Sequence, residues 1–362
     1  MEQFPSFDEA LQRLSDEAAR LTRFELHALS GASRADAARF AAAWGQIPVE
    51  HRRYIAREFV ESAEHNFEMD FYALFRVMLD DQDEAVRLDA IEGLWECDDA
   101  TLVQPLVHLL RHDPAAAVRA GAAIALSRFA LQAELGELDE RRAQMVVNAL
   151  LDTIHRADED ADVRRRAIEA LAYVEIDSVR DIIDAAYNDG DERMRASAVF
   201  AMGRTCDPFW ASTVLSELNA SEPEMRFEAA RAAGELKLRK AVPTLIKLLE
   251  DPDREVQEAA IWALGQVGGR QAKRALEKCL QSSDELVSEY AEEALRELAL
   301  GDVPLLLFSY ESKEEMEDTL DDDAWDEELD EDDLAELRDE DGEDEEWAAD
   351  LEDDEDDDWS LN

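Results

Sequence analysis

The chain has 362 residues, and 90 Asp and Glu against 37 Lys and Arg give a formal net charge of −53. This charge argues against a general nucleic-acid-binding protein, because basic residues that neutralise phosphates supply most of the affinity of such proteins. Three cysteines without a Cys-x-x-Cys pair argue against a disulfide framework or a thiolate zinc site. The sequence shows no signal peptide and no apolar run that could span a membrane, so we expect a cytoplasmic protein without membrane contact.

Residues 1–66 are expected to form an N-terminal cap of irregular helices. Apolar residues at three- to four-residue spacing predict one amphipathic helix over residues 6–29. A helical pair is predicted over 35–44 and 49–64, with Pro48 at the start of its second helix. This segment lacks the phrase that recurs in the rest of the chain. Since the end units of a repeat array must differ from its middle units, we interpret the segment as a cap.

A recurring sequence motif, called the phrase below, organises residues 67–310. In its clearest copy, residues 253–265, an acid is followed by an aliphatic anchor, small and apolar residues at helical spacing, and Gly. About seven copies, separated by 31 or 32 residues with one separation of 45, indicate an array of repeats that each contact their neighbours. The positions of the prolines predict two helices in each repeat, and strand signals are absent. The anchors are Val86, Val118, Val163, Met194, Met225, Val256 and Val287.

The separation of 45 residues lies between the second and third copies and indicates an insertion. We assign it to residues 132–141, which are polar and contain Gly136, and expect a loop there. Such a loop is either a tolerated surface insertion or part of a binding face. Residues 301–310 are expected to cover the final repeat. In the copy over 253–265, the residues predicted to pack in the core are Val256, Ala260, Ile261 and Leu264.

Residues 311–362 form a separate acidic segment, which holds 31 acids against Lys313 and Arg338. Its acids repel one another and its apolar residues are too sparse for a core, so we predict a disordered tail. In one interpretation, the segment is a solvated tail without a binding function. The alternation of acidic and apolar residues is instead typical of a disordered segment that folds when it binds a partner. Its tryptophans, which a merely solubilising tail does not need, are Trp325, Trp347 and Trp359.

Five arginines directly follow the anchor of a copy. One register on successive parallel helices places their guanidinium groups in a ladder. In one interpretation each arginine pairs with an acid of a neighbouring repeat and fixes the stacking. In the alternative, the ladder binds acidic side chains of a protein partner. In the last two copies, Gln257 and Ser288 stand at this position in place of arginine. The members of the ladder are Arg87, Arg119, Arg164, Arg195 and Arg226.

Catalytic and metal sites are not expected. Among six histidines, only His108 and His112 share a helical face, and a zinc site needs a third protein ligand and supporting partners. Gly265, Gly268 and Gly269 end a repeat helix and do not form a phosphate loop, because no strand precedes them. No catalytic triad or nucleophile elbow is visible. We therefore predict no catalytic residue, no metal and no cofactor.

The phrase, its two-helix context and its 31-residue period resemble HEAT-like repeats of the short type found in phycobilisome lyase subunits. The resemblance extends from about Met69 to Leu300. It implies an all-α fold, an α-solenoid of antiparallel helix pairs in a right-handed stack, whose usual role is protein binding. Some relatives attach or remove bilin pigments, and others hydroxylate deoxyhypusine with metal-binding His-Glu pairs. No His-Glu dipeptide occurs in this chain, so we do not expect an enzyme.

The main functional prediction is a monomeric, non-enzymatic scaffold or adaptor that binds protein partners, with an acidic arm for basic partners. A lyase-like pigment or cofactor chaperone, and an acidic nucleic-acid mimic or chaperone of basic proteins, stay open as alternatives. The basic window 226–278 predicts weak, salt-sensitive docking of the arm onto the fifth to seventh repeats, which would shield a site until a basic partner arrives. The window's candidate binding residues are Lys237, Arg239 and Lys240.

Overall fold

The computed structural model describes residues 5–16, 20–66 and 68–301, and this part of the chain is helical without any strand. The helices up to the long pair in the middle are α1 (Phe7–Leu14), α2 (Arg23–Leu29), α3 (Arg34–Trp44), α4 (Val49–His65), α5 (Tyr72–Met78), α6 (Glu84–Gly93), α7 (Val103–His112), α8 (Ala116–Glu134) and α9 (Glu140–His155).

The remaining helices are α10 (Ala161–Leu171), α11 (Val179–Tyr187), α12 (Glu192–Arg204), α13 (Ala211–Glu217), α14 (Pro223–Glu235), α15 (Val242–Leu248), α16 (Arg254–Val267), α17 (Gly269–Cys279) and α18 (Glu285–Gly301). Short 3-10 turns lead into three of the odd-numbered helices. They are η1 (Ala100–Leu102), η2 (Pro208–Trp210) and η3 (Arg239–Ala241).

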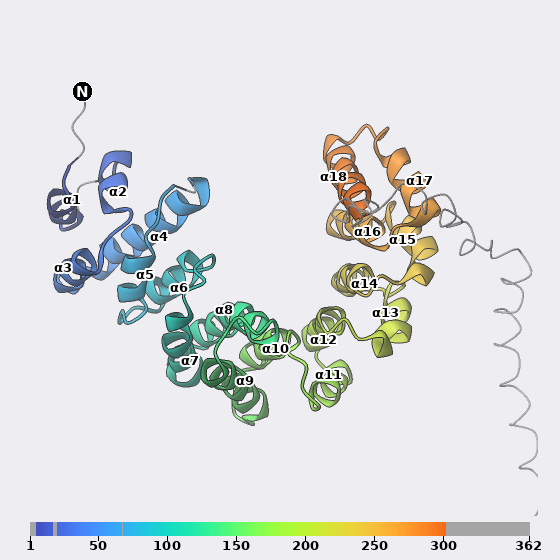
Figure 1. The fold of residues 1–362 in the computed structure, drawn as a ribbon, viewed down its shortest axis with the longest axis horizontal. Helices are drawn as coiled ribbons and strands as arrows, with labels where there is room; N and C mark the ends of the chain where they lie inside the picture. The colour runs from blue at the N-terminus through green and yellow to red at the C-terminus, as the bar shows by residue number, and fades with distance from the viewer. Residues whose placement is uncertain (1–4, 17–19, 67, 302–362) are drawn as a thin grey trace, which may run out of the picture. The chain divides into compact units, whose positions relative to one another are not determined.

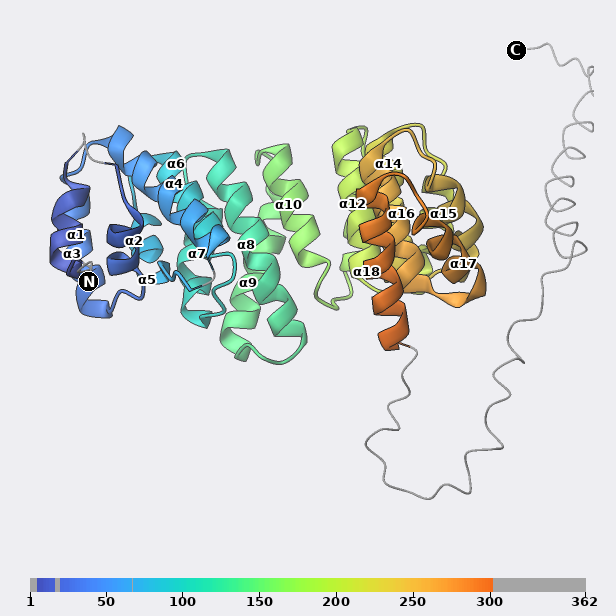
Figure 2. The ribbon, with the colours of Figure 1, turned by 90° about the horizontal axis from the view of Figure 1, so that it is seen from above.

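The helices form two rows, so the predicted α-solenoid is confirmed for the described residues (Figure 1). In the even row, each helix from α4 to α18 packs against the next even-numbered helix. In the odd row, each helix from α5 on packs against the even-numbered helix that follows it. Figure 2 shows the even-row helices lying side by side along their lengths. None of the described helices is long and apolar enough to cross a membrane.

The anchor aliphatics fill the space between the rows. Six of the seven anchors are buried, and Val287 in the final helix pair is half-buried. The core prediction for residues 253–265 is confirmed, because Val256, Ala260, Ile261 and Leu264 are at most 1% exposed. The acid of the phrase caps the second helix, since the Asp253 carboxylate accepts hydrogen bonds from the backbone N–H groups of Glu255 (3.0 Å) and Val256 (3.3 Å).

The glycine that closes the phrase permits close contact between even-row helices. A Cβ atom at Gly203 in α12 would lie 2.8 Å from the Ala232 Cα atom of α14. A Cβ atom at Gly234 in α14 would lie 3.0 Å from the Ala263 Cα atom of α16, and one at Gly265 would lie 2.9 Å from the next helix. Glycine costs about 1 kcal/mol against alanine inside a helix. Its recurrence every 31 residues therefore reflects packing.

The prediction of one helix over residues 6–29 is wrong. The segment forms α1 and α2, and each helix begins with its own capping box, Ser6 with Glu9 and Thr22 with Glu25. In such a box the Ser or Thr side chain and the acid three residues later satisfy N–H groups at a helix start. The second box begins a new helix although the apolar spacing continues across it.

The predicted insertion loop over residues 132–141 is also largely wrong. The extra residues lengthen α8 to 19 and α9 to 16 residues, so that only residues 135–139 connect the two helices. Ala, Leu, Gln and Glu, which favour helices, continue α8 beyond the buried residues Phe129 and Ala130. Asp139 then starts α9, because its carboxylate accepts a hydrogen bond from the Arg142 N–H at 3.2 Å.

The division into a cap over 1–66, a repeat array over 67–310 and an acidic tail over 311–362 stays a prediction. Within this division, α4 already packs against α6 as later even-row helices pack against each other. The helix pair α3 and α4 thus continues both rows. The acidic tail and residues 302–310 lie outside the described residues.

Candidate protein-binding face

Two ladder arginines are held in nearly the same buried ion-pair geometry. Arg87 in α6 donates to both carboxylate oxygens of Asp113, at 2.7 and 2.8 Å, and to the Asp81 carbonyl at 2.8 Å. Arg226 in α14 donates to both carboxylate oxygens of Asp251, each at 2.8 Å. This hydrogen-bonded guanidinium holds the pKa of Asp251 below its usual value. Both pairs join one repeat to the turn of the next.

The other ladder positions vary. Arg119 donates to Glu159 at 2.6 Å, also across a repeat boundary. Arg195 lies 3.5 Å from Glu217, and the Nε atom of Arg164 is buried without a hydrogen-bond partner. The ion-pair interpretation therefore describes Arg87, Arg119 and Arg226 well. Their guanidinium groups are already engaged within the chain.

The ladder continues at positions that the sequence pattern missed. Arg52 in α4 forms an ion pair with Asp81 at 2.8 Å and donates to the Ile47 carbonyl at 2.6 Å. The pattern does not find it because His51, which is buried, stands where other copies have an aliphatic anchor. Gln257 donates to the Asp251 carbonyl at 2.6 Å, so the amide keeps the backbone contact that the arginines make.

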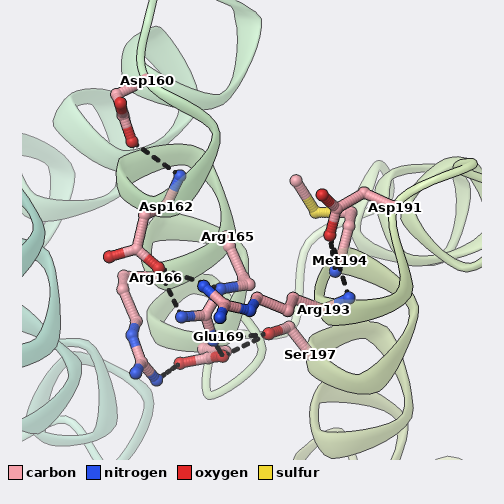
Figure 3. A network of polar contacts seen from close by, with 9 residues as sticks. All are labelled: Asp160, Asp162, Arg165, Arg166, Glu169, Asp191, Arg193, Met194 and Ser197. Atoms are coloured by element: carbon pink, nitrogen blue, oxygen red, sulfur yellow. Dashed lines mark hydrogen bonds and ion pairs between the residues drawn. The ribbon is translucent and has the colours of Figure 1, made fainter.

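A second polar cluster lies on the even row, where it joins α10 to α12 (Figure 3). The Ser197 hydroxyl of α12 is buried and donates to Glu169 of α10 at 2.5 Å. Arg165 donates to the Ser197 oxygen at 3.1 Å and to Glu169 at 3.2 Å. Arg166 donates to the other Glu169 oxygen at 2.8 Å, and Arg165 also bonds Asp162. Glu169 is thus a shared acceptor that fixes two neighbouring repeats.

Aromatic rings and arginines alternate next to this cluster. The Arg204 guanidinium of α12 lies 5.6 Å from the Tyr173 ring centroid and 4.9 Å from that of Phe200. The same guanidinium pairs with Glu235 of α14 at 3.1 Å. Such cation–π contacts each contribute about 0.5–1 kcal/mol at exposed sites. The arginine therefore links α12 and α14 with the segment that directly follows α10.

Glu228 of α14 is half-buried, and its side chain makes no hydrogen bond or ion pair with any described residue. Burial, followed by the nearby charge of Glu169, raises the pKa of Glu228 to about 7, while Arg231 opposes this rise. Arg231 itself lies 4.2 Å from the centroid of the Trp262 ring on α16. Burial also raises the pKa of Glu235. We define the even-row face as Arg165, Arg166, Glu169, Tyr173, Phe200, Arg204, Glu228, Arg231, Glu235 and Trp262.

The predicted binding residues do not gather on the even-row face. Lys237, Arg239 and Lys240 are exposed and precede α15 of the odd row. The tail residues Trp325, Trp347 and Trp359, and the predicted docking of the tail, lie outside the described residues. Sequence reasoning missed the even-row face, although one signal was present. The position six residues after the anchor holds Glu169, Phe200, Arg231 and Trp262 in successive repeats, which are polar or aromatic and not small.

The histidine pair lies elsewhere, on α7. The ring centroids of His108 and His112 are 5.1 Å apart. His112 also lines an open pocket with His155 of α9, where Arg111 pairs with Asp152 at 2.7 Å. Within the part of the chain that the structure describes, no group of three or more His, Cys, Asp or Glu could hold a metal ion.

The geometry defines a repeat protein with paired helices, and comparison with known families agrees. The HEAT repeat family matches residues 73–153, 147–209 and 211–296, so the chain belongs to the HEAT repeat family. The resemblance drawn from the 31-residue phrase is confirmed. A comparison with curated proteins gave no match.

Solved structures with a similar repeat fold come from several organisms. Escherichia coli YibA is 18% identical in sequence. The match covers 68% of this chain and 95% of the YibA chain, with a TM-score of 0.39. The complex of CpcE and CpcF of phycocyanin lyase from Nostoc sp. is 18% identical in sequence. The match covers 53% of this chain and 75% of the solved chain, with a TM-score of 0.39. Human deoxyhypusine hydroxylase in complex with glycerol is 17% identical in sequence. The match covers 81% of this chain and 96% of the solved chain, with a TM-score of 0.33.

Proposed function

We propose that the chain is a non-enzymatic scaffold that binds a protein partner across the even-row face of α10, α12, α14 and α16. The observation that carries this proposal is Glu228, a half-buried carboxylate whose side chain forms no hydrogen bond or ion pair with a described residue. Burial removes water from this carboxylate, and the nearby charge of Arg231 compensates only in part, so its pKa is raised. A Lys or Arg side chain of a bound partner would supply the missing positive charge.

The surroundings of Glu228 suit a protein partner. Aromatic residues and arginines are enriched where protein interfaces gain most of their binding energy. Tyr173, Phe200 and Trp262 are half-buried, and arginines lie over their rings. The ion pairs within α10 to α14 hold these side chains in place before a partner binds. Less conformational entropy is then lost in binding.

The acidic tail would form a second binding element for basic partners, with Trp325, Trp347 and Trp359 as apolar anchors. The net charge of −53 opposes direct binding to nucleic acid and to anionic membranes. We further infer a monomeric cytoplasmic protein; the free thiols of Cys97, Cys206 and Cys279 are compatible with a reducing compartment.

The test of the even-row face is cross-linking of the full-length protein in its native lysate, with a charge reversal at Glu228. Glu228→Arg should remove the main cross-linked partner, because it adds repulsion where the partner's positive charge would bind. The matched control is Glu137→Arg, which makes the same change of charge at an exposed connection residue. Recovery of one partner by the wild type and the control, but not by Glu228→Arg, supports the proposal. Equal recovery by all three proteins rules out the even-row face.

A further inference from the structure

The lysines of this chain are concentrated in one place. Of six lysines in 362 residues, five lie within residues 237–278, and all five are exposed. Two of the four exposed arginines of the same segment, Arg239 and Arg274, accompany them. We call this set the lysine surface. It consists of Lys237, Arg239, Lys240, Lys247, Lys273, Arg274 and Lys278.

The odd row carries these side chains on adjacent elements. Residues 237–240 lead through η3 into α15, whose last turn carries Lys247, and α15 packs against α17. In α17, Ala272, Ala275 and Leu276 are buried. Lys273, Arg274 and Lys278 are exposed on the opposite side of this helix, where Arg274 and Lys278 are four residues apart and the exposed Glu277 lies between the cations. Figure 1 shows α15 and α17 in the odd row, with α16 in the even row.

None of the seven cationic side chains forms a hydrogen bond or an ion pair with another described residue. This distinguishes them from many arginines of the chain, which have acidic partners even at exposed positions. Arg180 pairs with Asp207 at 2.6 Å, and Arg254 pairs with Asp284 at 2.5 Å. Like charges on neighbouring helix positions repel one another, and a bound anion would relieve that repulsion. The lysine surface is therefore strongly cationic, with Glu277 of α17 as an exposed acid among its seven cations.

We propose that the lysine surface binds a short acidic polypeptide segment of another protein. Lysine is a flexible point charge, which suits carboxylates at irregular spacing and does not require the bidentate geometry typical of arginine. A long polyanion such as nucleic acid would extend beyond the surface and meet the acids of α18, which packs against α17. The exposed acids of α18 are Glu285, Glu289, Glu292, Glu293 and Glu297.

This inference goes beyond the proposed function. The lysine surface belongs to the odd row, whereas the even-row face includes Glu228 and is expected to bind basic side chains. The two surfaces select partners of opposite charge. Failure of one proposal therefore leaves the other intact.

The test measures binding of a fluorescent oligoglutamate peptide to the full-length protein by anisotropy, at low and at raised salt. We expect salt-sensitive binding, because exposed charges are screened within about 8 Å at physiological ionic strength. The variant Lys273→Glu/Lys278→Glu should bind the peptide about tenfold more weakly or worse, since two attractive contacts become repulsive. Both side chains are exposed, so circular dichroism should show an unchanged fold.

The matched control is Arg141→Glu/Arg193→Glu, which changes the net charge equally at two exposed residues outside the lysine surface. It should bind the peptide within about twofold of the wild type. Equal weakening in both variants would show a general charge effect and overturn the proposal. Tighter binding of a DNA duplex of equal charge than of the peptide would also overturn it.

Carbodiimide coupling identifies the occupant, because it joins lysine amines to carboxylates in direct contact. With peptide present, mass spectrometry should find Lys273 or Lys278 coupled to the peptide. If the same lysines couple to carboxylates of their own chain, and excess peptide does not displace this product, the acidic segment comes from the chain itself and the proposal fails.

Discussion

Arg226 and Asp251 form a two-bonded ion pair across a repeat boundary, with both N–O distances at 2.8 Å. The pair is largely buried, with side-chain exposures of 12% and 5%. Breaking a buried pair by removing one partner leaves an uncompensated charge. Removal of either partner of this ion pair should therefore lower the free energy of unfolding.

Substitution of Arg226 by Ala should lower the free energy of unfolding by about 3 kcal/mol, because Asp251 loses its counter-ion in a buried position. Urea denaturation measures the change. Arg142→Ala is the control, since its pair with Asp139 is about half exposed and should contribute less than about 1 kcal/mol. Similar losses in both variants would contradict the burial of the ladder pair.

The ladder pair also predicts a pH dependence. Arg226 holds the pKa of folded Asp251 below the value of 3.8 that the unfolded chain should show. A depressed carboxyl pKa stabilises the fold above the unfolded pKa, and this contribution disappears as the pH falls. The stability difference between the wild type and Asp251→Asn should therefore shrink below about pH 4. A difference that grows toward acid pH would reverse the assigned sign.

Glu228→Gln should stabilise the protein at pH 8 and leave it unchanged below about pH 4.5, where the unfolded carboxyl is also protonated. The folded carboxyl has a pKa raised to about 7, so its ionisation opposes folding progressively as the pH rises. We expect a gain of about 2 kcal/mol at pH 8 by urea denaturation. Glu224→Gln, an exposed neighbour on the same helix, is the control and should show little change. A variant less stable than the wild type at pH 8 would mean that Glu228 has a favourable partner.

Leu264→Ala should cost about 2–5 kcal/mol, because Leu264 is fully buried and its truncation leaves a cavity. Thermal and urea denaturation give the change. Leu286→Ala is the matched control, because the Leu286 residue is 46% exposed. An equally stable Leu264→Ala variant would place this helix face outside the core.

Gly234→Ala should destabilise the protein although alanine favours helices by about 1 kcal/mol. The new methyl group would lie 2.6 Å from the Trp262 ring and 3.0 Å from the Ala263 Cα atom, so the helices must move apart. Gly45→Ala is the control, because nothing lies within 4 Å of the position of its Cβ atom. A melting temperature that rises in Gly234→Ala would show that α14 and α16 are not closely packed.

The repeat register could be predicted because the same aliphatic, small and glycine positions recur every 31 residues and all serve one packing geometry. The boundary at Thr22 was missed because apolar spacing continues through it, whereas the capping box that breaks the helix is a local hydrogen-bonding feature. Arg52 was missed because its anchor position holds His51.

The even-row face could not be predicted from the sequence pattern for a different reason. Its contacts join residues about one repeat apart, such as Glu169 with Ser197 and Arg231 with Trp262. Those side chains differ from repeat to repeat, so periodicity alone does not identify them. Only the packing of α10 to α16 brings them together.

The close contacts at the glycines have a consequence for how such a chain can change length. Gly203 of α12 faces Ala232 of α14, and Gly234 of the same α14 faces Ala263 of α16. Helix α14 thus carries both halves of the contact, an alanine toward the preceding repeat and a glycine toward the following one. A duplicated copy of α13 and α14 could follow the original with the same glycine-to-alanine fit. The unit is therefore a module that lengthens the protein by whole repeats without a new interface.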